Sequence, residues 1–360
     1  MEEKVSCGCG KASLLNLQEV RPAREPWIVG SVSVRGRTVP KISTSLSRRD
    51  VWGGVKVRWN IGRDRYAVLP GLYAAGTPAE ESPVLVTANY KLSFDTLRKS
   101  LQGIDAWILV LDTKGINVWC AAGKGTFGTR ELEQRIMKVR LEEVVSHRTL
   151  ILPQLAAPGV SAPDVKKASG WIVRYGPVRA DDIRAFFEAG QRKNESMREV
   201  RFQLPDRMAV APVQLTQAWP VLLAILAASA LSGLPFAPGY GTRFFDFLIP
   251  LAGGVLVAVF GFPALLPYLP FRAFALKGAV IGLVWGVVSA LVSGASAVSG
   301  AGLVLLVTPI AAFIAMNFTG ASTFTSQPGA ALEVRRGLAP MAASLFLGIG
   351  LSVAARFVGL

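Results

Sequence analysis

Short apolar runs alternate with amphipathic segments through the middle of the chain. Strand-like runs lie at residues 84–86, 107–111, 150–152 and 171–175. Each is followed by a segment with the apolar spacing of a helix, near residues 94–101, 126–145, 162–168 and 179–189. This alternation predicts a mostly parallel sheet with helices on both faces. We therefore expect an α/β domain of the Rossmann-like, parallel-sheet class over residues 27–190.

The chain ahead of this alternation has a different pattern. Residues 27–76 contain short alternating runs, such as Val55–Trp59, and predict mostly β-structure that leads into the domain. Gly53-Gly54 is interpreted as a break between strands. We expect Trp52 and Trp59 to be core aromatics. Residues 1–26 lack the apolar core of a signal peptide and are expected to form a flexible N-terminal segment.

The C-terminal part is strongly apolar. Five stretches of about 18–21 residues, enough to cross the hydrocarbon layer of a membrane, lie near residues 219–236, 247–266, 273–293, 301–318 and 338–358. They predict an all-α transmembrane domain with five helices over residues 218–360, after a polar linker at 191–217. Basic residues gather at one set of helix ends, and the loop near 294–300 carries no charge. The positive-inside rule then places the α/β domain in the cytoplasm and the C-terminus outside the cytoplasmic (inner) membrane.

Composition narrows the choice of partners. The formal net charge is +15, and only six of the 39 Lys and Arg residues lie beyond Gln217. A basic surface beside a membrane favours contact with anionic lipid headgroups or with an acidic protein. The sequence has no nucleic-acid-binding motif and no basic patch with interleaved aromatics, so we discount nucleic acid. Three cysteines make no disulfide framework, and a thiolate that must stay reduced fits the cytoplasm.

The turn after the second strand of the alternation is the candidate site. Asn117–Lys124 joins that strand to the next helix, and strand-to-helix turns are where α/β domains bind ligands. Cys120 lies in the turn, and three small residues follow it, so a large, flat ligand can approach the sulfur. The usual alternative is a buried, unreactive cysteine. Asn117 and Lys124 argue against that alternative, because no core position needs them.

Two phosphate-binding motifs fail at this turn. A P-loop needs a glycine and a hydroxyl residue at the positions that Val118 and Gly125 occupy. Gly123–Gly128 matches G-x-G-x-x-G, but the next strand ends in Pro153-Gln154, with no carboxylate for the ribose hydroxyls. Neither a P-loop nor a dinucleotide site is therefore expected.

The octapeptide Asn117-Val118-Trp119-Cys120-Ala121-Ala122-Gly123-Lys124 resembles the cap-helix signature of the corrinoid proteins of microbial mercury methylation. Those proteins are related to the corrinoid iron–sulfur proteins of the acetyl-CoA pathway, which lack the cysteine. The same resemblance extends to residues 84–91, 152–160, 175–178 and 316–323. It covers the chain from about Trp27 to the C-terminus.

The resemblance implies a cobalamin or related corrinoid at the strand ends, with Cys120 as the thiolate ligand of cobalt. The residues that it implies for cofactor binding are Thr87, Asn89, Asn117, Val118, Trp119, Cys120, Ala121, Ala122, Gly123, Lys124, Gln154, Ala157, Gly159, Tyr175 and Gly176. The residues alone leave Cys120, water and the cofactor's own base open as the lower ligand, because His147 lacks a D-x-H-x-x-G context. Trp119 is expected to pack, and Asn117 to hold the turn by local hydrogen bonds.

The implied function is a corrinoid-dependent methyltransferase that passes a methyl group from methyl-Co(III) cobalamin to Hg(II), forming methylmercury. The methyl group must then leave with its electron pair, and an anionic ligand opposite it favours this path. The implied partners are a methyltetrahydrofolate-linked methyl donor and a ferredoxin-like protein with two [4Fe–4S] clusters as electron donor. Cys7 and Cys9 form a pair suited to passing Hg(II), although incidental cysteines in a flexible tail are the simpler interpretation.

Two other functions stay open. One is a membrane-anchored corrinoid methyl carrier of acetyl-CoA-type one-carbon metabolism, for which mercury is incidental. Cys120 argues against it, because relatives that serve nucleophilic acceptors lack that thiolate. The other is a non-catalytic corrinoid-binding membrane sensor, which binds corrinoid without methyl turnover. A transporter is disfavoured, since no charged side chain lies in the middle of an apolar stretch.

Overall fold

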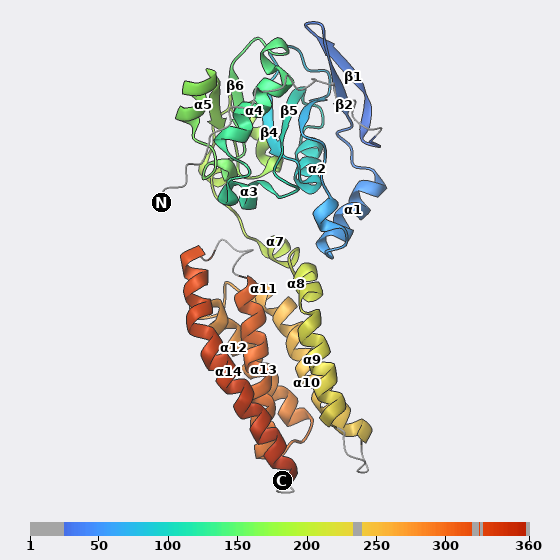
Figure 1. The fold of residues 1–360 in the computed structure, drawn as a ribbon, viewed down its shortest axis with the longest axis vertical. Helices are drawn as coiled ribbons and strands as arrows, with labels where there is room; N and C mark the ends of the chain where they lie inside the picture. The colour runs from blue at the N-terminus through green and yellow to red at the C-terminus, as the bar shows by residue number, and fades with distance from the viewer. Residues whose placement is uncertain (1–24, 233–239, 319–323, 325–326, 358–360) are drawn as a thin grey trace, which may run out of the picture. The chain divides into compact units, whose positions relative to one another are not determined.

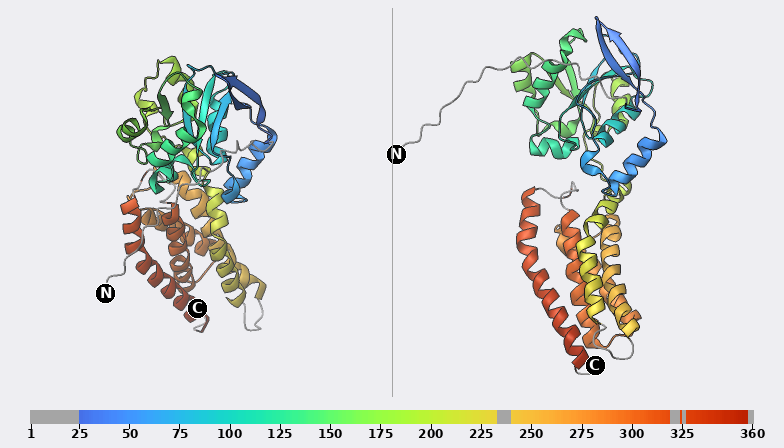
Figure 2. Two further views of the ribbon diagram at one scale, coloured as in Figure 1. Left: turned by 45° about the horizontal axis from the view of Figure 1, so that its top comes forward. Right: turned by 45° about the vertical axis from the view of Figure 1, so that its right-hand side comes forward.

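The computed structural model describes residues 25–232, 240–318, 324 and 327–357 (Figure 1, Figure 2). The chain divides into two compact units. The α/β unit comprises the described residues of Met1–Ser47 together with Ala67–Arg192, and the helical unit comprises the described residues of Arg48–Tyr66 and Lys193–Leu360. The division after Arg192 lies close to the expected end of the α/β domain at residue 190. Residues 48–66, expected in the α/β domain, and residues 193–217, expected as a linker, belong to the helical unit.

The α/β unit is built on a seven-stranded sheet in the order β1-β2-β3-β5-β4-β6-β7. Its strands are β1 (Ile28–Val34), β2 (Arg37–Ile42), β3 (Gly71–Ala75), β4 (Val84–Ala88), β5 (Ala106–Leu111), β6 (Thr149–Leu152) and β7 (Ile172–Tyr175). Strands β5, β4, β6 and β7 are parallel to one another, and β2 is parallel to β3. Strand β3 runs antiparallel to β5, and β1 pairs with β2 as an antiparallel hairpin at one edge (Figure 1). The sheet is therefore mixed and rich in parallel pairs.

Helices follow each of the four parallel strands β4 to β7, as the sequence pattern predicts. They are α2 (Lys91–Ser100), α3 (Val118–Lys124), α4 (Thr129–Val139), α5 (Ala162–Ser169) and α6 (Ile183–Glu188). One face of the sheet packs against α3, α4 and α5 in a single hydrophobic core. The alternate residues of the central strands are buried as well, and the ring of Phe94 in α2 lies 4.9 Å from Trp27 and 5.6 Å from Tyr73, centroid to centroid. Strands covered on both faces explain the continuous apolar runs.

The expected strand at Val55–Trp59 is wrong. Residues Arg48–Arg58 form helix α1, with Asp50 in its first turn and Lys56 and Arg58 in its last, the charge order that a helix dipole favours. Gly53 is not a strand break. A Cβ on Gly53 would lie 2.6 Å from the hydroxyl oxygen of Tyr66, so the glycine admits that ring against the helix.

The expectation that Trp52 and Trp59 are core aromatics is also wrong. Trp52 is 61% exposed and Trp59 is 42% exposed. The apparent alternation of residues 55–59 belongs to the last turn of a helix, where period 2 and period 3.6 cannot be told apart over five residues.

The helical unit also contains α7 to α14 and a π-helical turn. Their bounds are α7 (Leu204–Met208), α8 (Ala211–Gln217), α9 (Trp219–Ser232), α10 (Tyr240–Leu256), the π-turn Val257–Gly261, α11 (Phe262–Leu265), α12 (Phe274–Val292), α13 (Ala297–Asn317) and α14 (Gln327–Phe357). Within the described residues, four helical segments are long and apolar enough to cross a membrane, namely Arg243–Leu265, Phe274–Val292, Ala297–Asn317 and Pro328–Ala355. A fifth is obtained only if Leu204–Gln217 and Trp219–Ser232, which are bent by 52°, form one broken span.

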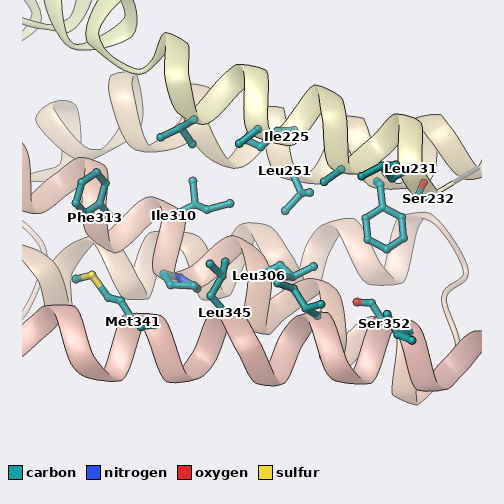
Figure 3. A pocket seen from close by; sticks show the side chains of 18 of the residues that line it. Ile225, Leu231, Ser232, Leu251, Leu306, Ile310, Phe313, Met341, Leu345 and Ser352 are labelled. Carbon is teal, nitrogen blue, oxygen red and sulfur yellow. The ribbon is translucent and has the colours of Figure 1, made fainter.

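Small residues and side-chain hydrogen bonds hold these helices together. A Cβ on Gly278 of α12 would lie 2.6 Å from the carbonyl oxygen of Ala311 in α13, so the two backbones pack directly. Pro309 leaves the carbonyl of Leu305 without its helical partner, and the hydroxyl of Ser344 in α14 donates to that oxygen at 2.9 Å. An apolar cavity of about 780 Å³ lies between α9, α10, α13 and α14, with the hydroxyls of Ser232 and Ser352 among its lining groups (Figure 3).

Arg98 of α2 generates a prediction about the stability of the α/β unit. The fully buried guanidinium donates from Nε to Asp95 Oδ1 at 2.7 Å and from Nη1 to the carbonyl oxygens of Ser43 and Ser45 at 2.7 and 3.0 Å. We expect Arg98→Met to lower the free energy of opening of α2 by about 3 kcal/mol, because buried acceptors lose a charged donor. Hydrogen exchange of the α2 amides in the full chain measures this. The exposed neighbour Lys99→Met is the control, and an equal effect of both substitutions would contradict the prediction.

Candidate functional site

The predicted strand-end loops meet at one edge of the sheet. Because β5, β4, β6 and β7 are parallel, the segments that follow them lie at the same carboxyl-terminal edge. Asn89 follows β4, α3 follows β5, the 3-10 turn Gln154–Ala156 follows β6, and Gly176 follows β7. The segments that the sequence singled out are therefore brought together.

Local hydrogen bonds and backbone geometry define α3. Asn117 is its N-cap residue, and Oδ1 of Asn117 accepts a hydrogen bond from the backbone N–H of Cys120 at 2.9 Å. The expected role of Asn117 in holding the turn is confirmed by this bond. Gly125 ends the helix with φ 78°, a left-handed conformation that glycine adopts without strain. The helix thus has a fixed start and a fixed end within seven residues.

The two faces of α3 differ sharply. Val118, Ala121 and Ala122 are buried against the sheet in the hydrophobic core. The remaining residues of the helix are exposed, and at spacings of one, three and four positions they share one face: Trp119, Cys120, Gly123 and Lys124. We call this the thiol face. The cysteine is free and exposed, and the 39% exposure of Trp119 does not fit its expected packing role.

A close backbone contact sets the position of α3. A Cβ on Gly159 would meet the carbonyl oxygen of Phe127, and it would lie 2.9 Å from Cα and 3.0 Å from the carbonyl oxygen of Ala122. The carbonyl of Gly159 accepts a hydrogen bond from the N–H of Thr129 at 3.2 Å. The loop after β6 therefore packs directly on the backbone of the cap helix and of the segment that follows it.

Asn89 organises the loop that leads into α3. Its Oδ1 accepts hydrogen bonds from the N–H of Thr113 at 3.1 Å, from the N–H of Gly115 at 2.9 Å and from the Thr113 hydroxyl at 2.8 Å. The Asn89 amide nitrogen lies 3.4 Å from Asp112 Oδ1. This buried amide thus joins the end of β4 to the chain between β5 and α3, and it acts on loop geometry rather than as a surface contact.

Asp112 is held by an ion pair of its side chain and by a hydrogen bond of its backbone. Its Oδ2 lies 2.6 Å from Lys114 Nζ, and its backbone N–H donates to Glu131 Oε1, which also accepts from Arg135. Burial alone would raise the pKa of the Asp112 carboxyl. The hydrogen bonds and charge of Lys114, with the more distant charge of Arg135, outweigh burial and hold that pKa below its ordinary value.

The other residues predicted to bind the cofactor differ in how deeply they are buried. Thr87 is buried within β4, and Gln154 and Ala157 are half-buried in the turn after β6. The Tyr175 hydroxyl donates to the carbonyl of Val160, and burial raises the pKa of this phenol. Gly176 packs near Ile151, where a Cβ would lie 3.0 Å from a methyl group. Thr87, Tyr175 and Gly176 therefore pack within the fold and support the loops of the site.

Two sets of residues complete the comparison with the sequence. Cys7 and Cys9 lie outside the described residues. The described residues hold no group of three or more His, Cys, Asp or Glu side chains arranged to bind a metal ion. His147 hydrogen-bonds through Nε2 to the carbonyl of Ser82 at 3.0 Å, away from the thiol face. Sequence reasoning missed Asp112 and Thr113, although their position directly after a buried strand was a usable signal.

Gly159→Ala tests the backbone contact. The added methyl group meets backbone atoms, which cannot rotate away, so we expect α3 to shift and its amides to exchange faster, with a cost of about 1–3 kcal/mol. Gly71→Ala is the matched control, because a Cβ there meets nothing within 4 Å. Hydrogen exchange that is unchanged in Gly159→Ala would show that the contact does not position α3.

The lowered pKa of Asp112 predicts a pH dependence. A carboxyl whose folded pKa lies below the unfolded value of about 3.9 stabilises the loop above that pH, and the contribution is lost as pH falls through the folded pKa. We expect protection of the Lys114 and Gly115 amides to fall over this acid range, and Asp112→Asn to abolish that part of the pH dependence. Substitution of the exposed Glu81→Gln should leave the profile unchanged. A profile insensitive to Asp112→Asn would contradict the assignment.

Comparison with known proteins relates part of the chain to one enzyme complex. Residues 56–187 match the family described as CO dehydrogenase/acetyl-CoA synthase delta subunit (CdhD). The acetyl-CoA decarbonylase/synthase complex subunit gamma of Archaeoglobus fulgidus is 33% identical over 152 residues, which are 41% of this chain and 32% of that protein. The subunit gamma of Methanopyrus kandleri is 37% identical over 128 residues, 35% of this chain and 27% of that protein. The chain thus spans about a third of the length of these relatives. The segment that matches the family contains strands β3 to β7 and the thiol face, and it contains none of the helices from α7 onward.

Proposed function

We propose that the α/β unit binds a corrinoid and carries a methyl group in one-carbon metabolism of the acetyl-CoA type. The observation that carries this proposal is the exposed thiol of Cys120 on α3, at the carboxyl-terminal edge of the parallel strands. The match of residues 56–187 to the CO dehydrogenase/acetyl-CoA synthase delta subunit family supports the same class of function, as does the similarity of part of the chain to acetyl-CoA decarbonylase/synthase gamma subunits. That similarity favours a methyl carrier more directly than it favours any particular methyl acceptor.

The thiol face fits a large, flat cofactor. Gly123 lies one turn further along the helix than Cys120, and it has no side chain that would fill the space next to the sulfur. Trp119 and Lys124 lie at the sides of the same face and are exposed. A corrinoid held there would bring a cobalt ion that accepts and releases methyl groups. The donor set of the described residues at this edge offers one soft ligand, the Cys120 sulfur.

The residues around Cys120 position the sulfur. Asn117 caps the first turn and fixes the backbone of Cys120, and the Gly159 contact fixes the helix against the sheet. Asn89 holds the loop ahead of the cap. Lys124 brings a positive charge to the same face, one turn from the sulfur. Cys120 is thus the proposed cobalt ligand, and the others are positioning residues.

In our second candidate function, Hg(II) is the methyl acceptor. The presence of a cysteine at position 120 favours this function. A thiolate donates more electron density to a metal than water or imidazole does, and axial donation is a main way in which proteins tune a cofactor metal. If Cys120 held the cobalt of a bound corrinoid, its electron donation would favour release of a methyl group with the electron pair, which an electrophile such as Hg(II) requires. A carrier that serves a nucleophilic acceptor gains nothing from this ligand. A corrinoid sensor would bind the cofactor without turnover.

The proposed setting is the cytoplasmic membrane. The four apolar helical segments, or five with the bent pair, have the length and composition of membrane spans. With the charge distribution of the sequence, they support an α/β unit on the cytoplasmic side and a C-terminus outside. We propose a ferredoxin-like protein with two [4Fe–4S] clusters as the electron donor and a methyltetrahydrofolate-linked protein as the methyl donor.

The first experiment tests corrinoid binding and the ligand together. Full-length protein in detergent is reconstituted with cobalamin, and its visible absorption spectrum is compared with that of Cys120→Ala. We expect bound corrinoid in both, with a sulfur-ligand spectrum only in the wild-type chain. Cys7→Ser with Cys9→Ser is the thiol control and should leave the spectrum unchanged. Absence of corrinoid binding by the wild-type chain would overturn the proposed function.

The second experiment distinguishes the acceptors. Protein loaded with methylcobalamin is mixed with Hg(II), and methylmercury is measured by chromatography with mercury detection. The mercury proposal predicts methylmercury from the wild-type chain and a loss of at least about tenfold in Cys120→Ala, which corresponds to about 1.4 kcal/mol. Equal rates from both proteins would remove the argument for Hg(II) and leave the methyl carrier as the better proposal.

A further inference from the structure

Helix α1 presents an aromatic face to the exterior. Arg48, Trp52, Val55 and Trp59 follow one another at intervals of four, three and four residues, which places them on one side of a helix. Val57 lies on the other side and is buried. A helix of a protein core has the opposite arrangement, with its large apolar residues inward. The outward indoles therefore need a different explanation from packing within the unit.

The exposed apolar surface extends beyond the two indoles. Val51 is 57% exposed beside Trp52, and Ile61, in the turn after the helix, is 62% exposed. Single apolar residues on a surface are normal. Four large ones within residues 51–61 form a patch, and exposed patches of this kind mark interaction sites. We call Val51, Trp52, Trp59 and Ile61 the α1 patch.

Cations flank the α1 patch. At 100° per residue, Arg49 and Lys56 lie on one flank of the aromatic face and Arg58 on the other, with Arg48 in the first turn. Residues 48–66 contain six Arg or Lys and two Asp. Long basic side chains lie with their stems along apolar surface while the charge stays at polar groups. Indoles with flanking cations are the composition of helices that lie in the interface of an anionic membrane.

The surroundings of α1 favour lipid over a protein partner. Residues 48–66 belong to the helical unit, together with the four segments that are apolar and long enough to cross a membrane. An acidic protein would satisfy the cations as well. A lipid surface satisfies both the cations and the indoles and is already the environment proposed for the unit that contains α1.

We propose that α1 and the turn after it bind the anionic headgroup layer of the membrane. The indoles of the α1 patch lie at the level between headgroup and acyl chain, and the flanking cations bind lipid phosphates. This inference rests on the proposed membrane insertion of the apolar helices and is independent of the corrinoid. Residues 48–66 lie between β2 and β3 in the sequence. The lipid contact therefore tethers the α/β unit through two chain connections in addition to the one after Arg192.

The test uses a nitroxide label in the full chain, in nanodiscs of phosphatidylcholine with or without phosphatidylglycerol. The label is attached after Trp52→Cys in a chain that also carries Cys7→Ser, Cys9→Ser and Cys120→Ser. Accessibility to oxygen, which concentrates in lipid, is compared with accessibility to a water-soluble nickel chelate. Met137→Cys supplies the control label, because Met137 is 66% exposed on α4 in the α/β unit.

In discs with phosphatidylglycerol, we expect the label at position 52 to favour oxygen and the label at position 137 to favour the chelate. Arg48→Glu with Arg49→Glu and Lys56→Glu should move the first label towards water. The first two changes fall in the first turn, where acidic residues suit a helix, so α1 is retained. Arg130→Glu with Lys166→Glu and Lys167→Glu, on exposed positions of α4 and α5, is the charge-matched control.

Equal chelate accessibility at positions 52 and 137 in the anionic discs would overturn the proposal, as would an equal response to the two sets of charge changes. A chain that enters no disc would overturn the membrane setting and this proposal together. Neither result bears on corrinoid binding, which the absorption spectrum tests separately.

Discussion

The position of Cys120 depends on how closely the loop after β6 approaches α3. Gly159 has no Cβ, so its backbone lies against Cα and the carbonyl oxygen of Ala122, on the buried side of the helix. Ala121 and Ala122 lie on the buried face of α3, and their small side chains allow the same close approach. The opposite side of a helix held this tightly must be exposed, and that side carries the cysteine. Packing on the inner face thus determines what the outer face can offer to a ligand.

Hydrogen bonds add direction to this packing. Asn117 fixes the start of α3 by accepting the N–H of Cys120, and Asn89 holds the preceding loop through three donors. Neither amide needs to touch a cofactor to affect it. Their effect is to reduce the motion of a short helix, which alone would be too short to be stable in water. The thiol is therefore presented by a pre-organised element rather than by a flexible loop.

Much of this arrangement could be predicted from the sequence, because the signals were local. The buried runs at 84–86 and 107–111 have the length and composition of parallel strands. The hydrophobic pattern predicted a turn over 117–124 ahead of a helix near 126–145, whereas the structure has α3 at Val118–Lys124 and α4 at Thr129–Val139, although Asn117 is a typical N-cap residue. The failures have physical causes as well. Helix α1 was interpreted as a strand because its last turn alternates polar and apolar residues, and its exposed tryptophans resemble core residues when only composition is considered. The contacts of Asn89 and Gly159 join segments 24 to 37 residues apart, which no local pattern reveals.

The match to the CO dehydrogenase/acetyl-CoA synthase delta subunit family covers residues 56–187, which include strands β3 to β7, whereas the apolar helices lie beyond it. The methyl-carrier proposal rests on the shared part, and the choice of acceptor rests on one sulfur atom. Cobalt X-ray absorption of the corrinoid-loaded full chain addresses that atom most directly. The account predicts a sulfur scatterer in the first coordination shell of cobalt that is lost in Cys120→Ala. A first shell of nitrogen and oxygen alone in the wild-type chain would contradict it.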